Sequence, residues 1–243
     1  MYLIPPAVEE KKEELYSYMD TLGIASKNIQ NSDLFLTAFI HKSYAADFKV
    51  ITSHNERLEF LGDGILGATV CKLLFQNYPE MPESEMTLYK IALVREETLA
   101  EVAREIGLDQ RIFISKGEEH AQGRKKDTIL GDAFEALLGY LYLDFGEEEV
   151  SKFVENHLYP KIKQIKKQPI KSYKTLVQEY TQKEHKITPE YQESEMEREG
   201  KDNTFLYKSE LLVAGEVKSE GFGANKKKAQ EDAAKNYYEK TII

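Results

Sequence analysis

The sequence predicts a mainly helical domain followed by a small α+β domain in which a helix, three strands and a second helix follow one another. Apolar residues recur every three or four positions through almost all of residues 8–160, the spacing of helices that bury one face. Nearer the C-terminus the period changes to the alternation of strands. Residues 1–160 carry 16 Lys and Arg against 28 Asp and Glu, whereas residues 161–243 carry 17 against 14, so the net charge of −9 divides into −12 and +3. We therefore expect domains at 8–160 and 171–243, joined by a linker at 161–170.

Six segments of the first domain have helical periodicity, and the breaks between them contain Gly, Pro or Asn. These segments are residues 9–23, 33–45, 54–78, 84–107, 125–146 and 147–167. Residues 110–119 are rich in β-branched residues and are expected to be either extended or a loop.

The second domain follows a linker that is basic, polar and broken by Pro169. Ser172 is the expected N-cap of a helix over residues 172–184. Strands are expected at residues 189–198, 204–213 and 215–224. A last helix over residues 225–240 is expected to be capped by Asn225, which completes the order α-β-β-β-α.

Composition excludes several classes of protein. The single cysteine, Cys71, cannot form an intrachain disulfide; its solitude fits a reducing cytosol, and we expect it to pack within its apolar helix. The N-terminus lacks the basic and apolar regions of a signal peptide, and no apolar run approaches the ~20 residues needed to span a bilayer. A phosphate-cradling glycine loop of the Walker type is also missing, which argues against nucleoside triphosphate chemistry. We expect a cytoplasmic protein without a membrane partner.

The segment NERLEFLGDGILG, residues 55–67, places three carboxylates on one side of a helix. At roughly 100° per residue, Glu56, Glu59 and Asp63 share one narrow face. The apolar residues expected on the opposite, buried side are Leu58, Leu61 and Ile65. A solvated acidic face is one interpretation. However, no Lys or Arg three or four residues from Glu59 or Asp63 on that face offsets the repulsion, which favours a divalent metal.

A second acidic pair lies in TILGDAFEALLGYLYL, residues 128–143. Asp132 and Glu135 are spaced i, i+3 on a strongly apolar helix, where buried carboxylates without a partner or metal cost several kcal/mol. The helix dipole is an alternative reason for Asp132 but not for Glu135. Gly131 and Gly139 leave room for another backbone to approach. Two helices that each bring two carboxylates favour Mg²⁺ or Mn²⁺, which could activate water for phosphodiester hydrolysis.

Several segments resemble the ribonuclease III family. NERLEFLGDGIL is similar to the family's signature segment, and GDAFEALLGYLYLD is similar to its second acidic segment. HKSY, ESEMTLYKIALVREETLA and DTILGD lie in the family's order, and the resemblance extends from about residue 10 to the end of the chain. It implies a ribonuclease III-like helical endonuclease domain that forms a homodimer around a cleft holding double-stranded RNA.

The resemblance also implies roles for particular carboxylates. The catalytic metal site carries over to Glu59, Asp63, Asp132 and Glu135. Glu59, Asp132 and Glu135 are expected to bind Mg²⁺, with Mn²⁺ as a second choice, and Asp63 and Glu135 are expected to be most directly needed for hydrolysis. Glu56 and Glu83 match acidic positions with secondary roles in the cleft. Gly64 stands where many relatives have Ala and should loosen the helix slightly.

The α-β-β-β-α order, with KKKAQEDAA opening the last helix, resembles the double-stranded RNA-binding domain. Proteins recognise A-form RNA mainly by its shape, phosphates and 2′-hydroxyls. The expected phosphate contacts are Lys226, Lys227 and Lys228, with a solvated lysine run as the alternative. The residues that match the family's minor-groove contacts are Thr175, Gln178, Glu179 and Gln182, with a hydrophilic outer face as the alternative. The family's Gly-Pro-x-His loop is altered: Gly200 is kept without the Pro or the His, and Lys201 or Asn203 is the expected substitute.

Together these features predict a bacterial-type ribonuclease III. The resemblance implies a Mg²⁺-dependent homodimeric endonuclease that leaves 5′-phosphate and 3′-hydroxyl ends on duplex RNA, with ribosomal and messenger RNA precursors as substrates. The main alternative is a non-cleaving double-stranded RNA-binding protein that retains the fold. That alternative requires at least one lost carboxylate, and all four are present. A small-molecule metal hydrolase is disfavoured by the basic C-terminal unit.

Overall fold

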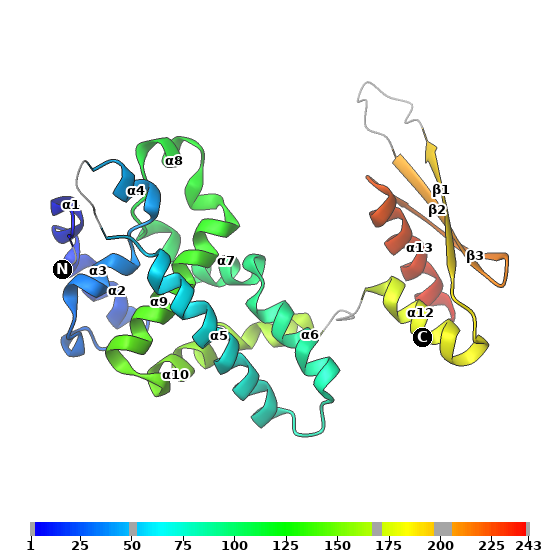
Figure 1. Ribbon diagram of the computed structural model, residues 1–243, viewed down its shortest axis with the longest axis horizontal. Coiled ribbons are helices and arrows are strands. Elements are labelled where there is room, and N and C mark those ends of the chain that lie inside the picture. Colours follow the sequence, from blue (N-terminus) through cyan, green and yellow to red (C-terminus); the bar gives the residue numbers. More distant parts are fainter. Residues whose placement is uncertain (1–2, 49–52, 167–171, 197–205, 242–243) are drawn as a thin grey trace. The chain divides into compact units, whose positions relative to one another are not determined.

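The computed structural model describes residues 3–48, 53–166, 172–196 and 206–241. The chain divides into two compact units, Met1–Lys167 and Gln168–Ile243, here called the helical unit and the α+β unit. The predicted fold class is confirmed: helices alone form the first unit apart from one isolated bridge among its described residues, and helices with one sheet form the second (Figure 1). The predicted domain bounds of 8–160 and 171–243 stay a prediction. Within the described parts of the chain, no helix has the length and apolar character needed to cross a membrane.

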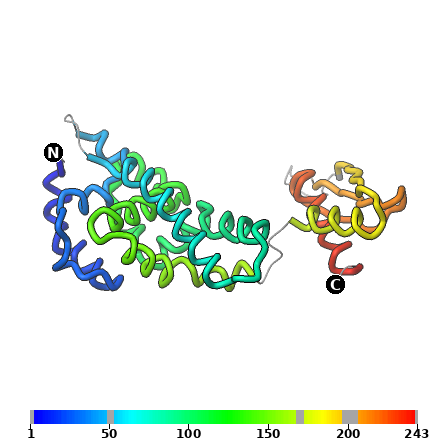
Figure 2. Tube along the Cα trace, turned by 60° about the horizontal axis from the view of Figure 1, so that its bottom comes forward, coloured from blue at the N-terminus to red at the C-terminus, as the bar shows by residue number. Residues whose placement is uncertain are grey.

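The helical unit is built from α-helices and short 3₁₀ helices, the latter labelled η. In chain order they are α1 (Pro6–Glu9), α2 (Lys12–Thr21), η1 (Ser26–Asn28), α3 (Ser32–Ala38), α4 (Lys42–Ala46), α5 (Glu56–Asn77), α6 (Glu83–Val94), α7 (Glu96–Glu105), η2 (Leu108–Gln110), α8 (Lys116–His120), η3 (Gly123–Lys125), α9 (Asp127–Phe145), α10 (Glu147–His157), η4 (Tyr159–Lys161) and α11 (Ile162–Ile165). The first helices, blue in Figure 2, gather at one end of this unit.

Several expected helices are divided in two. The segment at 33–45 breaks at Ile40, which pairs with Phe113 in an isolated parallel bridge, so part of the 110–119 segment is extended. The segment at 84–107 breaks at Arg95, whose ψ of 149° is extended. Lys161, in the predicted linker, is buried against Glu101 and Glu105 of α7, with its Nζ 2.8 and 2.6 Å from their carboxylates. The start of the predicted linker therefore packs within the helical unit.

The helices α5 and α9 form the most extensive contact between helices, and two glycines set their distance. A Cβ on Gly62 would lie 1.8 Å from the backbone oxygen of Glu135, and a Cβ on Gly139 would lie 2.2 Å from that of Leu58. The close approach predicted at Gly139 is present. At Gly131 the backbone of Glu96 also comes near, but its oxygen would lie 3.8 Å from an added Cβ, which is an ordinary contact, so glycine is not required at this position. The missing side chains let the two backbones touch where they cross.

The buried side of α5 differs from the predicted one. Its buried residues are Leu58, Gly62, Leu66, Thr69, Val70, Leu73 and Leu74. Glu59 and Leu66 are only about 20° apart around the helix, so the acidic line borders the core instead of opposing it. Leu61 and Ile65 are only half-buried. The expectation that Cys71 packs within its apolar helix is also wrong, because its side chain is exposed.

The α+β unit has the predicted order of elements. It contains α12 (Tyr173–His185), β1 (Glu190–Met196), β2 (Leu206–Val213), β3 (Glu216–Gly223) and α13 (Lys226–Thr241). The antiparallel sheet has the order β1-β2-β3, and both helices lie on one face of it (Figure 1). Its core joins Val177 of α12 to Leu211 of β2 and Tyr237 of α13. The altered loop with Gly200, Lys201 and Asn203 lies outside the described residues.

Both predicted caps of this unit are present. The Ser172 hydroxyl accepts a hydrogen bond from the backbone N–H of Thr175 at 3.2 Å. The Asn225 side chain accepts one from the backbone N–H of Lys228 at 2.9 Å. Each cap fixes the first turn of its helix, which contains Thr175 in α12 and the three predicted phosphate-binding lysines in α13.

Candidate metal centre and nucleic-acid interface

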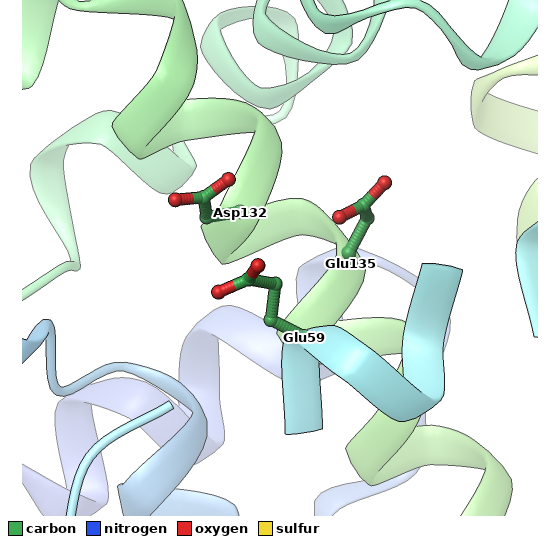
Figure 3. Close-up of side chains that lie close together, drawn as sticks. All are labelled: Glu59, Asp132 and Glu135. Carbon is green, nitrogen blue, oxygen red and sulfur yellow. The ribbon is translucent and has the colours of Figure 1, made fainter. Parts of the chain in front are cut away.

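Three of the predicted carboxylates converge where α5 crosses α9 (Figure 3). Glu59 projects from the first turn of α5, whereas Asp132 and Glu135 project from α9, and one oxygen of each lies within 4.8 Å of the other two. All three residues are half-buried. Oxygens on opposite sides of one Mg²⁺ lie about 4.2 Å apart, so this donor set fits a single hard cation.

The electrostatics of the cluster also favour a cation. Burial, followed by repulsion from Asp63, Asp132 and Glu59, raises the pKa of Glu135 to about 8. Burial is also the main reason that the pKa values of Glu59 and Asp132 are raised. Three carboxyls that oppose one another's ionisation in this way are stabilised in their charged form by a nearby positive charge.

Asp63 lies one helical turn beyond Glu59 and is exposed. It lies outside the three-carboxylate cluster, but its charge raises the pKa values of Glu135 and Glu59. The structure therefore places Asp63 beside the cluster, on its solvent side.

Glu56 and Glu83, the two acids with expected secondary roles, lie in different surroundings. Glu56 pairs with Lys42, whose Nζ lies 2.9 Å from Oε1, and this hydrogen bond lowers the pKa of Glu56. Glu83 begins α6 and accepts a hydrogen bond from the Thr87 hydroxyl. It lines a groove with Cys71, which lies about 18 Å along α5 from Glu59. A single chain therefore does not bring Glu83 to the three carboxylates.

Lys42 lies near the cluster although the helical spacing of the sequence does not indicate it. A neutralising cation on the same helix would stand three or four residues from a carboxylate, whereas Lys42 comes from α4, 14 positions before Glu56. A signal was present, because Lys42 belongs to the HKSY segment, which lies just upstream of the acidic motif.

The α+β unit brings members of both sets of predicted RNA-binding residues to one groove. Thr175 and Gln178 of α12 line it together with Lys227 and Lys228 of α13. All the predicted residues on these two helices are exposed: Thr175, Gln178, Glu179, Gln182, Lys226, Lys227 and Lys228. The three lysines occupy the first turn of α13, where the dipole of the helix N-terminus adds to their attraction for phosphate.

Known protein families match both units. A family model described as "Ribonuclease-III-like" matches residues 31–162, and one described as "Double-stranded RNA binding motif" matches residues 173–240. A Streptococcus pyogenes protein (serotype M5, strain Manfredo) named Ribonuclease 3 is 40% identical over 221 residues, which is 90% of this chain and 95% of that protein.

Solved structures agree with this relationship. Two structures of the nuclease domain of ribonuclease III from Campylobacter jejuni are similar to the helical unit. One has 31% identity and a TM-score of 0.53, covers 59% of this chain and 96% of that chain, and concerns flexibility in a region involved in dimer formation of that domain. The other has 30% identity and a TM-score of 0.55, and covers 61% of this chain and 96% of that chain.

The carboxylates at the α5–α9 crossing, the α-β-β-β-α unit and the similarity along nine-tenths of the chain lead to one assignment. The chain belongs to the ribonuclease III family of double-stranded RNA endonucleases.

Proposed function

We propose that this chain cleaves double-stranded RNA with Mg²⁺ held by Glu59, Asp132 and Glu135. The observation that carries the proposal is the convergence of these three half-buried carboxylates from two helices. An all-oxygen site suits Mg²⁺, and Mn²⁺ would accept the same ligands.

Asp63 and Glu135 are the residues that we propose to act most directly in hydrolysis. A bound Mg²⁺ activates water and stabilises the leaving oxygen. Asp63 stands on the solvent side of the cluster, where its carboxylate can accept a hydrogen bond from the attacking water and orient it. The proposed products carry 5′-phosphate and 3′-hydroxyl ends. Glu56 and Glu83 take secondary roles, and the role of Glu83 requires a cleft that a second copy of the chain completes.

The α+β unit contributes affinity for duplex RNA. Its groove combines polar side chains of α12 with the lysines of α13, which suits the ribose hydroxyls and phosphates of an A-form helix. We propose structured precursors of ribosomal and messenger RNA as the natural substrates, on the strength of the family resemblance. We also propose a cytoplasmic location, because the single exposed thiol of Cys71 suits a reducing compartment.

The test of this function is cleavage of a perfect RNA duplex in Mg²⁺, with and without EDTA. We expect cutting in Mg²⁺, loss of cutting in EDTA, and 5′-phosphate ends on the products. Binding of the duplex without any cutting in Mg²⁺ or Mn²⁺ would favour the alternative, a non-cleaving RNA-binding protein.

The lysine cluster is expected to supply mainly sequence-independent affinity. Replacing Lys226, Lys227 and Lys228 with Ala should weaken binding to different duplex sequences to a similar extent. It should also flatten the dependence of affinity on salt, because fewer counterions are released on binding when phosphate contacts are lost. Gel shifts at several salt concentrations measure both effects. An unchanged salt slope would show that the three lysines do not contact phosphate.

We further propose that the protein is a homodimer formed through the helical unit. Large apolar side chains are exposed there: Phe60 by 84%, Phe75 by 72%, Ile91 by 55% and Leu143 by 54%. Phe60 and Leu143 line the same groove, and Phe60 directly follows Glu59. Apolar exposure of this extent in one unit is typical of a surface that another protein covers.

Sedimentation at micromolar concentration should therefore give about twice the chain mass of 28.0 kDa. Phe60→Lys should shift the protein towards the monomer, because it places a charge in the apolar contact. Val217→Lys, at an exposed apolar residue of β3, is the matched control and should leave the mass unchanged. A wild-type monomer that cuts both strands would contradict the proposed dimer.

A further inference from the structure

The helical unit faces an electrostatic difficulty, since its carboxylates must meet a polyanion. Residues 1–160 have a net charge of −12, from 16 Lys and Arg against 28 Asp and Glu, and several of the acids gather at the α5–α9 crossing. A phosphodiester that approaches them is repelled by every carboxylate that the cation does not neutralise. Entry of the RNA strand is therefore helped by a positive side chain at the edge of the cluster.

Lys42 is a cation in that position. Its side chain is 60% exposed, and its Nζ lies 2.9 Å from Oε1 of Glu56. Its charge also acts on the cluster itself, where it opposes the effect of burial on the pKa values of Glu59 and Asp132. Lys42 is thus close enough to influence two proposed metal ligands while its ammonium stays open to solvent.

The backbone around Lys42 is fixed on both sides of the residue. The N–H of Asn55, directly before α5, donates to the Ile40 oxygen at 2.8 Å, and the N–H of His41 donates to the Phe113 oxygen at 3.0 Å. The N–H of Ser115 donates to the Ser43 hydroxyl at 3.1 Å. These bonds hold the start of α4 against the start of α5, so less conformational freedom is lost when the Lys42 side chain binds a ligand.

The pairing with Glu56 leaves Lys42 available. Both partners are largely exposed, at 60% and 45%, and ion pairs of this kind are weak. An ammonium group has three donors, so it can keep Glu56 and bind a phosphate oxygen at the same time. Glu56 then orients the lysine rather than neutralising it completely.

We propose that the Lys42 ammonium binds a phosphate of the RNA strand next to the phosphodiester held at the three-carboxylate cluster. This inference rests on the proposed function and adds to it a contact of the helical unit with the substrate. Lys42 is a positioning residue for the strand, and Glu56 acts through it.

The experiment is single-turnover cleavage of duplex RNA in Mg²⁺ by the full chain, over a range of RNA and salt concentrations. Lys42→Met keeps the length of the side chain and removes its charge. We expect about a tenfold rise in the half-saturating RNA concentration, and a salt dependence shallower by about one unit in a log–log plot, as for one lost phosphate contact. Lys42→Arg should retain most of the affinity.

Two further variants separate contact with RNA from local neutralisation. Lys152→Met removes a similarly exposed lysine that pairs with Glu148 on α10, and it should behave as wild type. If Lys42 served only to neutralise Glu56, the double variant Lys42→Met/Glu56→Gln would restore the half-saturating RNA concentration and the salt dependence of wild type. That result would overturn the proposal. The proposal would also be overturned if Lys42→Met showed the same saturation and salt dependence as Lys152→Met. A persistent defect in the double variant supports the contact. A wild-type chain that fails to cut duplex RNA refutes the proposed function itself, and this inference with it.

Discussion

Replacing Glu135 with Gln should slow cleavage of duplex RNA at least ~100-fold while leaving affinity for the duplex nearly unchanged. The substitution keeps the volume of the side chain but removes one charged ligand from the three-carboxylate cluster. The groove of the α+β unit that we propose to bind RNA is built from other elements and keeps all its residues. Single-turnover cleavage and gel shift with the same duplex measure the two quantities, and excess Mn²⁺ should restore part of the rate if weak metal occupancy is the main defect.

Glu155→Gln provides a matched control, because Glu155 is an exposed acid on α10. It should cut at the wild-type rate. Full activity of Glu135→Gln would remove Glu135 from the active site, and weakened duplex binding by this variant would show that the helical unit contributes affinity through the residue.

The same variant should also change the pH dependence of stability in EDTA. The pKa of Glu135 is about 8 in the folded chain, above the ordinary 4.5, so the folded state binds this proton more tightly than the unfolded state does. The contribution of Glu135 to the free energy of unfolding therefore falls as pH rises from about 4.5 to about 8. Gln does not titrate, so the melting temperature of the variant minus that of wild type should increase across this window. A difference that stays constant with pH would contradict the raised pKa.

Gly62→Ala should destabilise the helical unit by about 3 kcal/mol. The new Cβ would lie 1.8 Å from the backbone oxygen of Glu135, and a backbone atom at a helix crossing can move aside only if α5 and α9 separate. Urea unfolding monitored by circular dichroism measures the change. Since Glu135 is itself the residue in contact, this substitution should also slow cleavage at temperatures where the chain stays folded.

Gly64→Ala is the matched control, two residues further along the same helix. A Cβ on Gly64 would meet no heavy atom within 4 Å, so Ala should stabilise α5 by roughly 0.5–1 kcal/mol through its greater helix propensity. A fall in the free energy of unfolding for Gly62→Ala together with a rise for Gly64→Ala would support the close approach of α5 and α9 at Gly62. Equal tolerance of Ala at both positions would show that α5 and α9 do not touch at Gly62.

Three of the four carboxylates expected at the metal site could be brought together from the sequence, but the side of α5 that is buried could not be predicted. The family's motifs locate Glu59, Asp132 and Glu135 without any knowledge of packing, and the structure brings them together. The buried side of α5 depends on where α9 packs against it. Gly62 determines that position because its missing side chain lets the backbone of α9 approach, and apolar periodicity does not show this contact. Leu61 was therefore predicted to be buried but is only half-buried.

Other differences also arise from contacts that apolar periodicity does not show. The break at Arg95 separates α6 from α7 without a Gly or Pro, and it is stabilised by the Thr98 hydroxyl, which donates to the Ala92 oxygen at 2.8 Å. The pairing of Lys42 with Glu56 likewise joins two helices that are separate in sequence. Local periodicity contains no information about either contact, whereas the caps at Ser172 and Asn225 are local and were predicted correctly.

The α5–α9 crossing gives the metal ion a second effect. Because Glu59 belongs to one helix and Asp132 and Glu135 to the other, a bound cation would act as a non-covalent cross-link between the two largest helices of the unit. By mass action, each tenfold rise in free metal above its dissociation constant adds about 1.4 kcal/mol to the stability of the folded chain. The concentration of free metal in the cell would thus determine how much of the protein is folded and how long it survives proteolysis, as well as how fast it cuts RNA.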